Sequence, residues 1–475
     1  MRVRLLGAIL LLAAVVPAIL APGAAEAAFT VINVSNDTEL QDAFTTINGN
    51  PSQDYDVRIA PGTYNPLSTL EVNGDATRCV KIRRFPNIGA APVVLDGLLI
   101  TRIFNFVSGC IDVTQVVIQN GIADDSGAAA LIGSNAKVKF KRCSILNNVS
   151  AIAGGAIHVY QGGELELSRC EMALNSAGDP NNPGAAILNE GKTTIKRSTI
   201  DGNTMAEGTI ASMPFIFPEA TPFLFLDQST VTNNGLDAPP LVARAAGPTT
   251  GQGAAILNDG TATITNSTIS HNQDQGAAGG LSAIGGTITV RNTIVANNSG
   301  GNCNEAGGDI VSNGHNLENT NTCGFTLATD KRNTPAGLGP LQNNGGGIPT
   351  RLPGPTSAAI DTGGGTGPLD QRGMSRPQGL KRDRGAVEVG FCFGERETKV
   401  GTDEANTLNG TTGVDVMFGL GGNDKLVGKA GNDRLCGDAG TDQLRGDAGG
   451  GDKCNGGPPA TGDTQTGCET TVNIP

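Results

Sequence analysis

Short stretches in which apolar and polar residues alternate recur along the first two-thirds of the chain. In the segment 137–141, Val138 and Phe140 alternate with three lysines, and the segments 261–265 and 287–290 follow the same rule. Alternation with a period of two residues is typical of a β-strand that buries one face. The pattern therefore predicts an all-β region built from short strands.

A phrase of one apolar residue, two variable residues and an asparagine recurs among these strands. Its asparagines are Asn120, Asn148, Asn175, Asn203, Asn234, Asn272 and Asn297, separated by 28, 27, 28, 31, 38 and 25 residues. A repeat of this length is one coil of a parallel β-helix, in which each coil buries its apolar side chains against its neighbours. Stacked asparagines can then form a hydrogen-bonded ladder along one turn. The repeats predict a β-helix over residues 28–335.

The first coil needs a cap, and the segment 36–48 fits a capping helix. Asn36 is an N-cap residue with Glu39 three residues later. The apolar residues Leu40, Ala43, Phe44 and Ile47 then follow on one helical face. This helix, followed by a strand over 56–64, resembles right-handed β-helix proteins of the pectate-lyase type. The repeated phrases also resemble the polymorphic outer-membrane adhesins.

These resemblances imply a right-handed parallel β-helix with an N-terminal capping helix. They leave the function open, because this architecture carries lyases, hydrolases and adhesins alike. The segment 336–392 contains Asp370-Gln371-Arg372-Gly373 and resembles the closing part of bacterial surface β-helix proteins that carry a variable anchor. We expect its Asp and Arg residues to form structural ion pairs.

From Gly401 the chain adopts a strict period of nine residues. Glycine opens the units at Gly401, Gly410, Gly419, Gly428, Gly437 and Gly446, and the fourth position is Gly413, Gly422, Gly431, Gly440 and Gly449. The sixth position is Asn406, Asp415, Asp424, Asp433 and Asp442, with Asp452 in a last unit that slips by one residue. The eighth position is Leu408, Met417, Leu426, Leu435 and Leu444.

The glycines allow a tight turn whose carbonyl groups point inward. The sixth position adds a carboxylate to each turn, and the apolar eighth position points into a narrow core. Calcium takes about six to eight hard oxygen ligands, which carbonyl groups and carboxylates supply. With two units in each coil, Asp415, Asp433 and Asp452 stack on one side, and Asp424 and Asp442 on the other. The pattern resembles the RTX or haemolysin-type calcium repeat, which implies a short calcium-loaded β-roll over residues 393–457.

The candidate calcium ligands are therefore Asn406, Asp415, Asp424, Asp433, Asp442 and Asp452, with Gly410, Gly413, Gly419, Gly422, Gly428, Gly431, Gly437 and Gly440 shaping the turns. Residues 401–456 contain nine acidic and five basic residues, a net charge of −4. Without metal these oxygens would repel one another, so we expect the segment to fold only with Ca²⁺. Residues 458–475 are expected to form a C-terminal tail.

The first 27 residues have the composition of a signal peptide. Arg2 and Arg4 precede an apolar run over 5–21, and a small-x-small site lies at 25–27. Because the mature chain has no other apolar run of spanning length, we expect no transmembrane segment and a secreted or cell-surface protein. Ten cysteines suit disulfide bonds there. Cys143 and Cys170 occupy the same position in successive coils and are the disulfide candidates.

Net charge, histidine content and an aromatic loop limit the kinds of ligand and activity that we expect. A net charge of −12 argues against binding to nucleic acid or to anionic membranes. The three histidines match no catalytic motif, and His158 is expected to face solvent. Phe215 and Phe217 lie in an enlarged coil and can form a ligand platform with the next enlarged coil, or else fold back onto the solenoid.

We therefore predict a calcium-binding repeat protein outside the cytoplasm that serves as an adhesion or ligand-binding module for carbohydrate or a cell-surface protein. The alternative is a secreted β-helix polysaccharide lyase or glycoside hydrolase.

Overall fold

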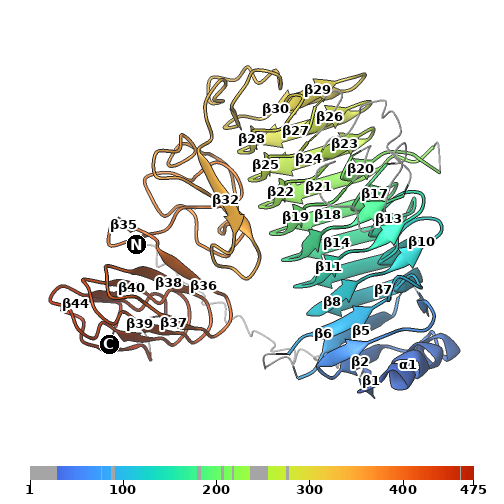
Figure 1. The fold of residues 1–475 in the computed structure, drawn as a ribbon, viewed down its shortest axis with the longest axis horizontal. Helices are drawn as coiled ribbons and strands as arrows, with labels where there is room; N and C mark the ends of the chain where they lie inside the picture. Colours follow the sequence, from blue (N-terminus) through green and yellow to red (C-terminus); the bar gives the residue numbers. More distant parts are fainter. Residues whose placement is uncertain are drawn as a thin grey trace, which may run out of the picture.

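The computed structural model describes residues 29–75, 77–86, 91–178, 183–204, 208–216, 219–235, 255–273, 278–459 and 462–474. Within this part, the chain is almost entirely β-structure with one helix, α1 (Asp37–Gly49) (Figure 1). The predicted signal peptide over residues 1–27 lies outside the described residues, so it stays a prediction.

A long solenoid is formed by three parallel sheets, with 18, 10 and three strands. The largest contains β1 (Thr30–Val34), β2 (Tyr55–Ile59), β4 (Leu70–Asn73), β5 (Cys79–Arg84), β7 (Phe104–Thr114), β10 (Ala130–Lys141), β13 (Ile157–Val159), β14 (Glu164–Ser168), β17 (Ile187–Asn189), β18 (Lys192–Lys196), β20 (Ile210–Ser212), β21 (Phe223–Asp227), β23 (Ile256–Asn258), β24 (Thr261–Thr265), β26 (Leu281–Ala283), β27 (Thr287–Arg291), β29 (Cys303–Glu305) and β30 (Asp309–Ser312). The second contains β3 (Gly62–Tyr64), β6 (Val93–Asp96), β8 (Val116–Gln119), β11 (Ser144–Leu146), β15 (Glu171–Ala173), β19 (Thr199–Asp201), β22 (Thr230–Thr232), β25 (Thr268–Ser270), β28 (Ile294–Ala296) and β31 (Leu317–Glu318). The third contains β9 (Ile122–Ala123), β12 (Val149–Ser150) and β16 (Ser176–Ala177).

The predicted parallel β-helix is confirmed. Strand β14 pairs in parallel with β10 on one side and with β18 on the other, so that Leu165 lies opposite Val138 and Thr193. Val138 and Phe140 are buried whereas the flanking Lys139 is exposed, as the alternation predicted.

The capping helix is confirmed as well. The Asn36 side chain accepts a hydrogen bond from the backbone N–H of Glu39 at 2.9 Å, and the Glu39 carboxylate accepts one from the N–H of Ser35 at 2.7 Å. The apolar face of α1, which contains Leu40, Ala43, Phe44 and Ile47, is buried at the end of the solenoid. The first bond satisfies an amide group that the first helical turn leaves free, and the second ties the residue before the N-cap to the helix.

The asparagine ladder exists, and its two ends are shifted by one residue. Each side-chain amide donates to the next Asn Oδ1 at 2.9 Å through the series Asn148, Asn175, Asn203, Asn234, Asn272 and Asn298. Asn120 and Asn297, which the repeat phrase included, lie outside it. Strand register is the cause: Ile118 lies opposite Ile145, so Gly121 and not Asn120 donates to the Asn148 side chain.

Cys143 and Cys170 are free, buried thiols, so the prediction that they form a disulfide is wrong. They do stack in successive coils, but both side chains point the same way along the solenoid. Cys143 Sγ donates to Val113 O at 3.5 Å, and Cys170 Sγ donates to Phe140 O at 3.2 Å. The disulfides instead join Cys79–Cys110, Cys303–Cys323, Cys392–Cys436 and Cys454–Cys468.

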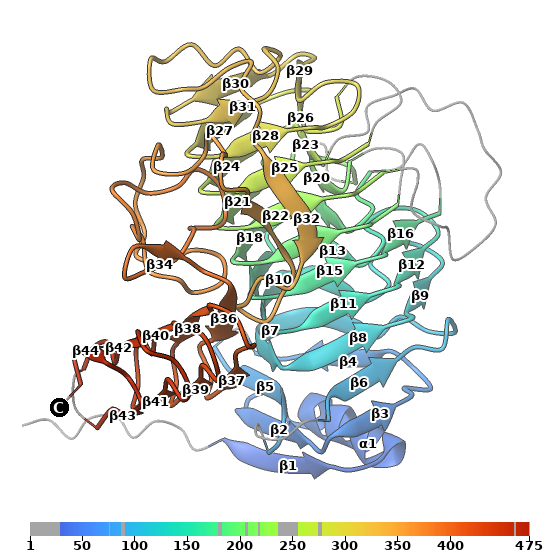
Figure 2. The same ribbon diagram turned by 60° about the vertical axis from the view of Figure 1, so that its left-hand side comes forward.

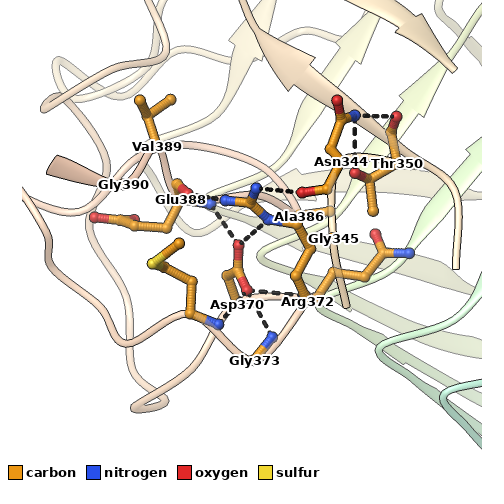
Figure 3. A network of polar contacts seen from close by, with 12 residues as sticks. Asn344, Gly345, Thr350, Asp370, Arg372, Gly373, Ala386, Glu388, Val389 and Gly390 are labelled. Atoms are coloured by element: carbon orange, nitrogen blue, oxygen red, sulfur yellow. Dashed lines mark hydrogen bonds and ion pairs between the residues drawn. The ribbon is translucent and has the colours of Figure 1, made fainter. Parts of the chain in front are cut away.

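The closing segment lies along the side of the solenoid and leads into the roll (Figure 2). It contains the antiparallel pair β32 (Leu338–Gln342) and β33 (Thr350–Pro353), followed by β34 (Phe391–Cys392) and β35 (Glu395–Arg396). Its centre is the fully buried Arg372, whose guanidinium pairs with Asp370 at 3.1 Å (Figure 3). The same guanidinium also pairs with Glu397 at 2.9 Å. This buried network fixes the segment that joins the two repeat regions.

The roll consists of two parallel sheets that take alternate strands. One contains β36 (Lys399–Thr402), β38 (Val416–Leu420), β40 (Arg434–Cys436), β42 (Lys453–Asn455) and β44 (Thr470–Val472), and the other contains β37 (Thr407–Asn409), β39 (Lys425–Val427), β41 (Gln443–Arg445) and β43 (Thr464–Thr466). Two nine-residue units thus make one coil. Met417, Leu426, Leu435 and Leu444 form its narrow core together with Cys454. Strands β43 and β44 extend the roll into residues 458–475, where the sequence predicted a tail.

Candidate functional site

In every unit after the first, the turns of the roll bring a glycine and a carboxylate together. A side chain placed on Gly428 would overlap Asp433 Oδ2, and the same relation joins Gly419 to Asp424 and Gly437 to Asp442. The first position of each unit is therefore glycine because the carboxylate at the sixth position occupies the space of a side chain.

The fourth-position glycines have a different role, which is close approach between turns. A side chain on Gly431 would overlap the carbonyl oxygen of Gly413, and one on Gly440 would overlap that of Gly422. The φ angles of Gly422, Gly431 and Gly440 are also positive, at 97°, 129° and 151°. Stacked turns thus place backbone carbonyl groups close to the neighbouring carboxylates.

The sixth-position side chains form two columns along the roll. In each, one carboxylate oxygen accepts a hydrogen bond from the backbone N–H of the column member before it. Asp433 Oδ1 accepts from Asp415 at 2.8 Å, and Asp452 Oδ1 accepts from Asp433 at 2.7 Å. In the other column, Asp424 Oδ1 accepts from Asn406 at 2.7 Å and Asp442 Oδ1 from Asp424 at 2.8 Å. The two columns have the membership expected from the period.

The second carboxylate oxygen of most column members has no partner. The Oδ2 atoms of Asp424, Asp433, Asp442, Asp452 and Asp463 are buried and make no hydrogen bond. A buried, unpaired carboxylate oxygen is costly. Burial raises the pKa of Asp424 to about 6 and also raises the pKa of Asp433 and of Asp442. A cation beside these oxygens would remove the cost.

The first member of each column differs from the rest. Asp415 Oδ2 accepts hydrogen bonds from Thr411 N at 2.6 Å and from Thr411 Oγ1 at 2.9 Å. Asn406 Oδ1 accepts from Thr402 N at 2.6 Å. Because their own turns already satisfy these oxygens, Asn406 and Asp415 fit a cation less well than the later predicted ligands.

Asp463 and Glu469 continue the columns and escaped the sequence analysis. Asp463 Oδ1 accepts from Asp442 N at 2.8 Å, and Glu469 Oε2 accepts from Asp452 N at 2.6 Å. In the regular turns the Asp comes five positions after the opening Gly, and in the slipped unit Asp452 comes six positions after Gly446. Asp463 comes seven positions after Gly456, so the nine-residue period is lost there. A side chain on Gly456 would nevertheless overlap Asp463 Oδ2. Gly456 was therefore the feature of the sequence that could have indicated a further turn with a carboxylate.

The donor set has the chemistry of calcium and not of a softer metal. In the described part of the chain, no group of three or more His, Cys, Asp or Glu side chains lies close enough to hold a metal ion. Backbone carbonyl oxygens of the stacked turns are the other hard oxygen donors beside these carboxylates. Hard cations such as Ca²⁺ accept such a set.

The other predicted positions lie on the solenoid. The backbone N–H groups of Phe215 and Ile216 donate to Glu190 Oε1, which anchors this loop, while the Phe215 side chain stays 37 % exposed. Phe217 lies outside the described residues. His158 is fully buried, so the expectation that it faces solvent is wrong. Its ring packs edge-on against Tyr160 with centroids 4.4 Å apart, and its Nδ1 lies 2.7 Å from Ser126 Oγ.

Comparison with known proteins identifies the repeats of the roll. The family model described as RTX calcium-binding nonapeptide repeat matches residues 400–435 and 418–451. The chain therefore carries RTX calcium-binding repeats within the roll. No curated protein matches the chain. Within the described residues, no helix is long and apolar enough to cross a membrane.

Among solved structures, the chain is similar to the PL6 family alginate lyase AlyGC. The identity is 12 %, the match covers 92 % of this chain and 74 % of that one, and the TM-score is 0.21. An arginine-to-alanine mutant of that lyase gives 10 % identity, 94 % and 76 % coverage and a TM-score of 0.20. Likenesses at this level carry no argument about activity.

Proposed function

We propose that this chain is a secreted or cell-surface calcium-binding protein in which Ca²⁺ completes the roll. The observation that carries the proposal is the set of five buried Oδ2 atoms, distributed over the two columns, that have no hydrogen-bond partner. Each belongs to a turn whose opening glycine leaves the carboxylate room, and at four of these glycines a carbonyl oxygen of a stacked turn lies beside the same space. Calcium bound there would neutralise carboxylates that otherwise repel one another.

Placement outside the cytoplasm is supported by the disulfides. Four disulfide bonds, two of which involve the roll, suit an oxidising compartment. Calcium is scarce inside cells and abundant outside, so a roll that needs calcium would become rigid only after export. This link between location and folding is part of the proposal.

The solenoid would then present a ligand-binding surface, as an adhesion module does. The support is the loop around Phe215, whose backbone is anchored by Glu190 while the side chains of Phe215 and Ile216 are 37 % and 48 % exposed. An anchored backbone that exposes apolar side chains has a low entropic cost of binding.

Calcium binding is tested on the full chain by equilibrium dialysis and isothermal titration. We expect uptake of several ions and a loss of one or more of them in the Asp424→Ala/Asp433→Ala double variant. The control is Asp124→Ala/Asp309→Ala, which removes two exposed carboxylates of the solenoid and should change nothing. A wild-type chain that takes up no calcium would contradict the proposal.

Ligand binding is tested with a panel of soluble polysaccharides, pectate and alginate included, and with immobilised cell-surface proteins. Saturable binding that Phe215→Ala weakens about tenfold, without any polymer cleavage, would support an adhesion module. Depolymerisation by the wild-type chain would instead favour the alternative of a β-helix polysaccharide lyase or hydrolase.

A further inference from the structure

Three arginines occupy one position in three successive coils of the solenoid. Arg142, Arg169 and Arg197 each follow the last residue of β10, β14 or β18, and those last residues lie opposite one another in the sheet. All three have left-handed backbone conformations, with φ of 52°, 56° and 49°. Their side chains therefore leave the solenoid at the same turn, about 4.8 Å apart from coil to coil. We call this row the arginine ladder.

A row of like charges at this spacing is unfavourable unless opposite charges lie against it. The first turn of the roll supplies them for Arg142 and Arg169, while Arg197 Nε donates to Gln371 O of the closing segment at 3.2 Å. Asp403 pairs with Arg169 and lies 3.8 Å from Arg142, while Glu404 pairs with Arg142 and accepts a hydrogen bond from Gln115 at 3.4 Å. Segments more than 200 residues apart in the chain are thus joined by charge.

This contact depends on charge more than on apolar packing. A cavity of about 200 Å³, lined by Arg142, Arg169, Asp403 and Glu404 among others, lies between the solenoid, the closing segment and the first turn. The ion pairs are partly exposed, with 38 % of the Arg142 side chain and 54 % of the Glu404 side chain accessible. Such pairs are individually weak and are screened by salt.

The same first turn is in direct contact with the first turn that has an unpaired carboxylate. Gly421 N donates to Thr402 O at 3.2 Å, Lys425 N donates to Asn406 O at 2.9 Å, and Asn406 N donates to Asp424 Oδ1 at 2.7 Å. A side chain on Gly422 would overlap the backbone of Glu404. The turn that carries Asp403 and Glu404 is thus hydrogen-bonded to the turn of Asp424, on the side of its Oδ1 atom.

We propose that the arginine ladder is a docking surface for the first turn of the roll, and that this docking and the binding of calcium beside Asp424 reinforce each other. The ladder holds the turn whose backbone donates to Asp424 Oδ1, and calcium is expected at the other oxygen of the same carboxylate. Calcium in turn orders the turn that presents Asp403 and Glu404 to the ladder. Linkage makes the effect reciprocal, because each event raises the affinity of the other by the same factor.

The neutral residue Asn406 fits this assignment. It replaces Asp in the unit whose turn contacts the ladder, so the first turn has no sixth-position carboxylate to be neutralised by metal. Its acidic groups are instead Asp403 and Glu404, which face the arginines. The turn is therefore held by protein cations on one side, and a calcium ion is expected on the other.

The test compares calcium titrations of three full-length proteins: wild type, Arg142→Gln/Arg169→Gln, and the control Lys137→Ala/Lys139→Ala. The control removes two lysines of β10 whose ion pairs are made with Glu164 and Glu166 of the solenoid and not with Asp403 or Glu404. A simple charge effect would raise the calcium affinity of the arginine variant, because two cations are lost near a cation site. The docking proposal requires the opposite, a loss of about three- to tenfold at one site.

A second variant guards against misfolding of the first. Asp403→Asn/Glu404→Gln removes the partners on the roll and should lower calcium affinity by a similar factor. Combining both double variants should add little further loss, because the same contact is broken twice. The difference from wild type should also shrink in molar salt.

Equal or higher calcium affinity in the arginine variant would overturn the docking proposal and leave the proposed calcium function intact. The inference rests on that function, so a wild-type chain without calcium uptake would overturn both. Additive losses in the combined variant would also overturn the inference, since they would show two independent effects.

Discussion

At the scale of single residues, the roll depends on positions where the absence of a side chain matters. Gly428→Ala would put a methyl group against Asp433 Oδ2 and against the carbonyl oxygen of Gly446. We expect about 1–3 kcal/mol of destabilisation of the roll, together with weaker calcium binding, because the carboxylate must move. Thermal unfolding with and without calcium measures the first effect, and calorimetric titration measures the second.

The chain offers a matched control for this substitution. Gly450 lies in the same roll, and a Cβ placed there meets nothing within 4 Å. Gly450→Ala should leave both the unfolding temperature and the calcium affinity close to those of wild type. Equal effects of the two substitutions would contradict the close fit between glycine and carboxylate.

A buried carboxyl in the closing segment makes stability depend on pH. Burial raises the pKa of Glu388 to about 7, although Arg376 lies 3.4 Å away and acts in the opposite direction. A carboxyl whose pKa is raised in the folded state binds its proton more tightly there than in the unfolded chain. Its stabilising effect is therefore complete below about pH 4.5 and is lost as the pH rises through about 7.

We accordingly expect the chain to gain about 2–3 kcal/mol between pH 8 and pH 5 from this group. The measurement is chemical unfolding across this range in saturating calcium, so that the roll contributes little. Glu388→Gln should flatten the profile, since the amide does not titrate. Burial also raises the pKa of Asp383, to about 6. The free energy of unfolding of the variant should therefore still fall with rising pH, but less steeply than that of wild type. An unchanged slope in the variant would rule out Glu388 as its source.

At the scale of elements, the asparagine ladder ties neighbouring coils together. Asn203 is fully buried, its Oδ1 accepts from the Asn175 side chain, and its side-chain amide and backbone N–H both donate to Asn234 Oδ1. Asn203→Ala should cost about 2–4 kcal/mol, because it leaves donors and acceptors in adjacent coils without partners. Lys196→Ala, on the exposed face of the same coil, should cost little. Similar losses in both variants would argue against the ladder.

The elements were predictable where one physical signal decides them. Alternation gave the strands of the solenoid, the Asn36 cap gave α1, and the nine-residue period gave the roll as far as Asp452. Register and side-chain direction were not predictable from such signals. The repeat phrase aligned Asn120 with Asn148, whereas the strand register aligns Gly121 with Asn148. The repeat also placed Cys143 and Cys170 at equivalent positions, but it did not show that both side chains point the same way along the solenoid.

Two further differences from the sequence-based predictions concern His158, which neighbouring residues bury, and Asp463, which lies in a turn of irregular length. His158 has an outward position on a strand, but Tyr160 and the Ser126 hydrogen bond enclose it. Asp463 was missed because its unit has an insertion, although its carboxylate repeats the geometry of Asp442. Within the candidate site, the sequence therefore predicted which residue types stack in the turns, and the structure shows which of their oxygens are left without partners.

At the scale of the whole molecule, two repeat regions with different sources of stability are joined by one buried network. The solenoid has a continuous apolar core that runs from α1 to Phe325. The roll has a thin core of five residues and a row of buried carboxylates. Arg372 connects the closing segment to Glu397 at the entrance to the roll. Only the roll is expected to respond strongly to calcium.

Differential scanning calorimetry should therefore resolve two transitions for the full chain. Calcium in excess over its dissociation constant stabilises the state that binds it, by about 2.7 kcal/mol for each site at a hundredfold excess. The transition of the roll should rise by many degrees on adding calcium and fall on adding a chelator, whereas that of the solenoid should move little. The disulfides Cys392–Cys436 and Cys454–Cys468 should keep the chelated roll partly compact, so its response should grow after reduction. A solenoid transition that moves as far as that of the roll would mean that calcium acts on the whole chain, and the separation of the two regions would then be wrong.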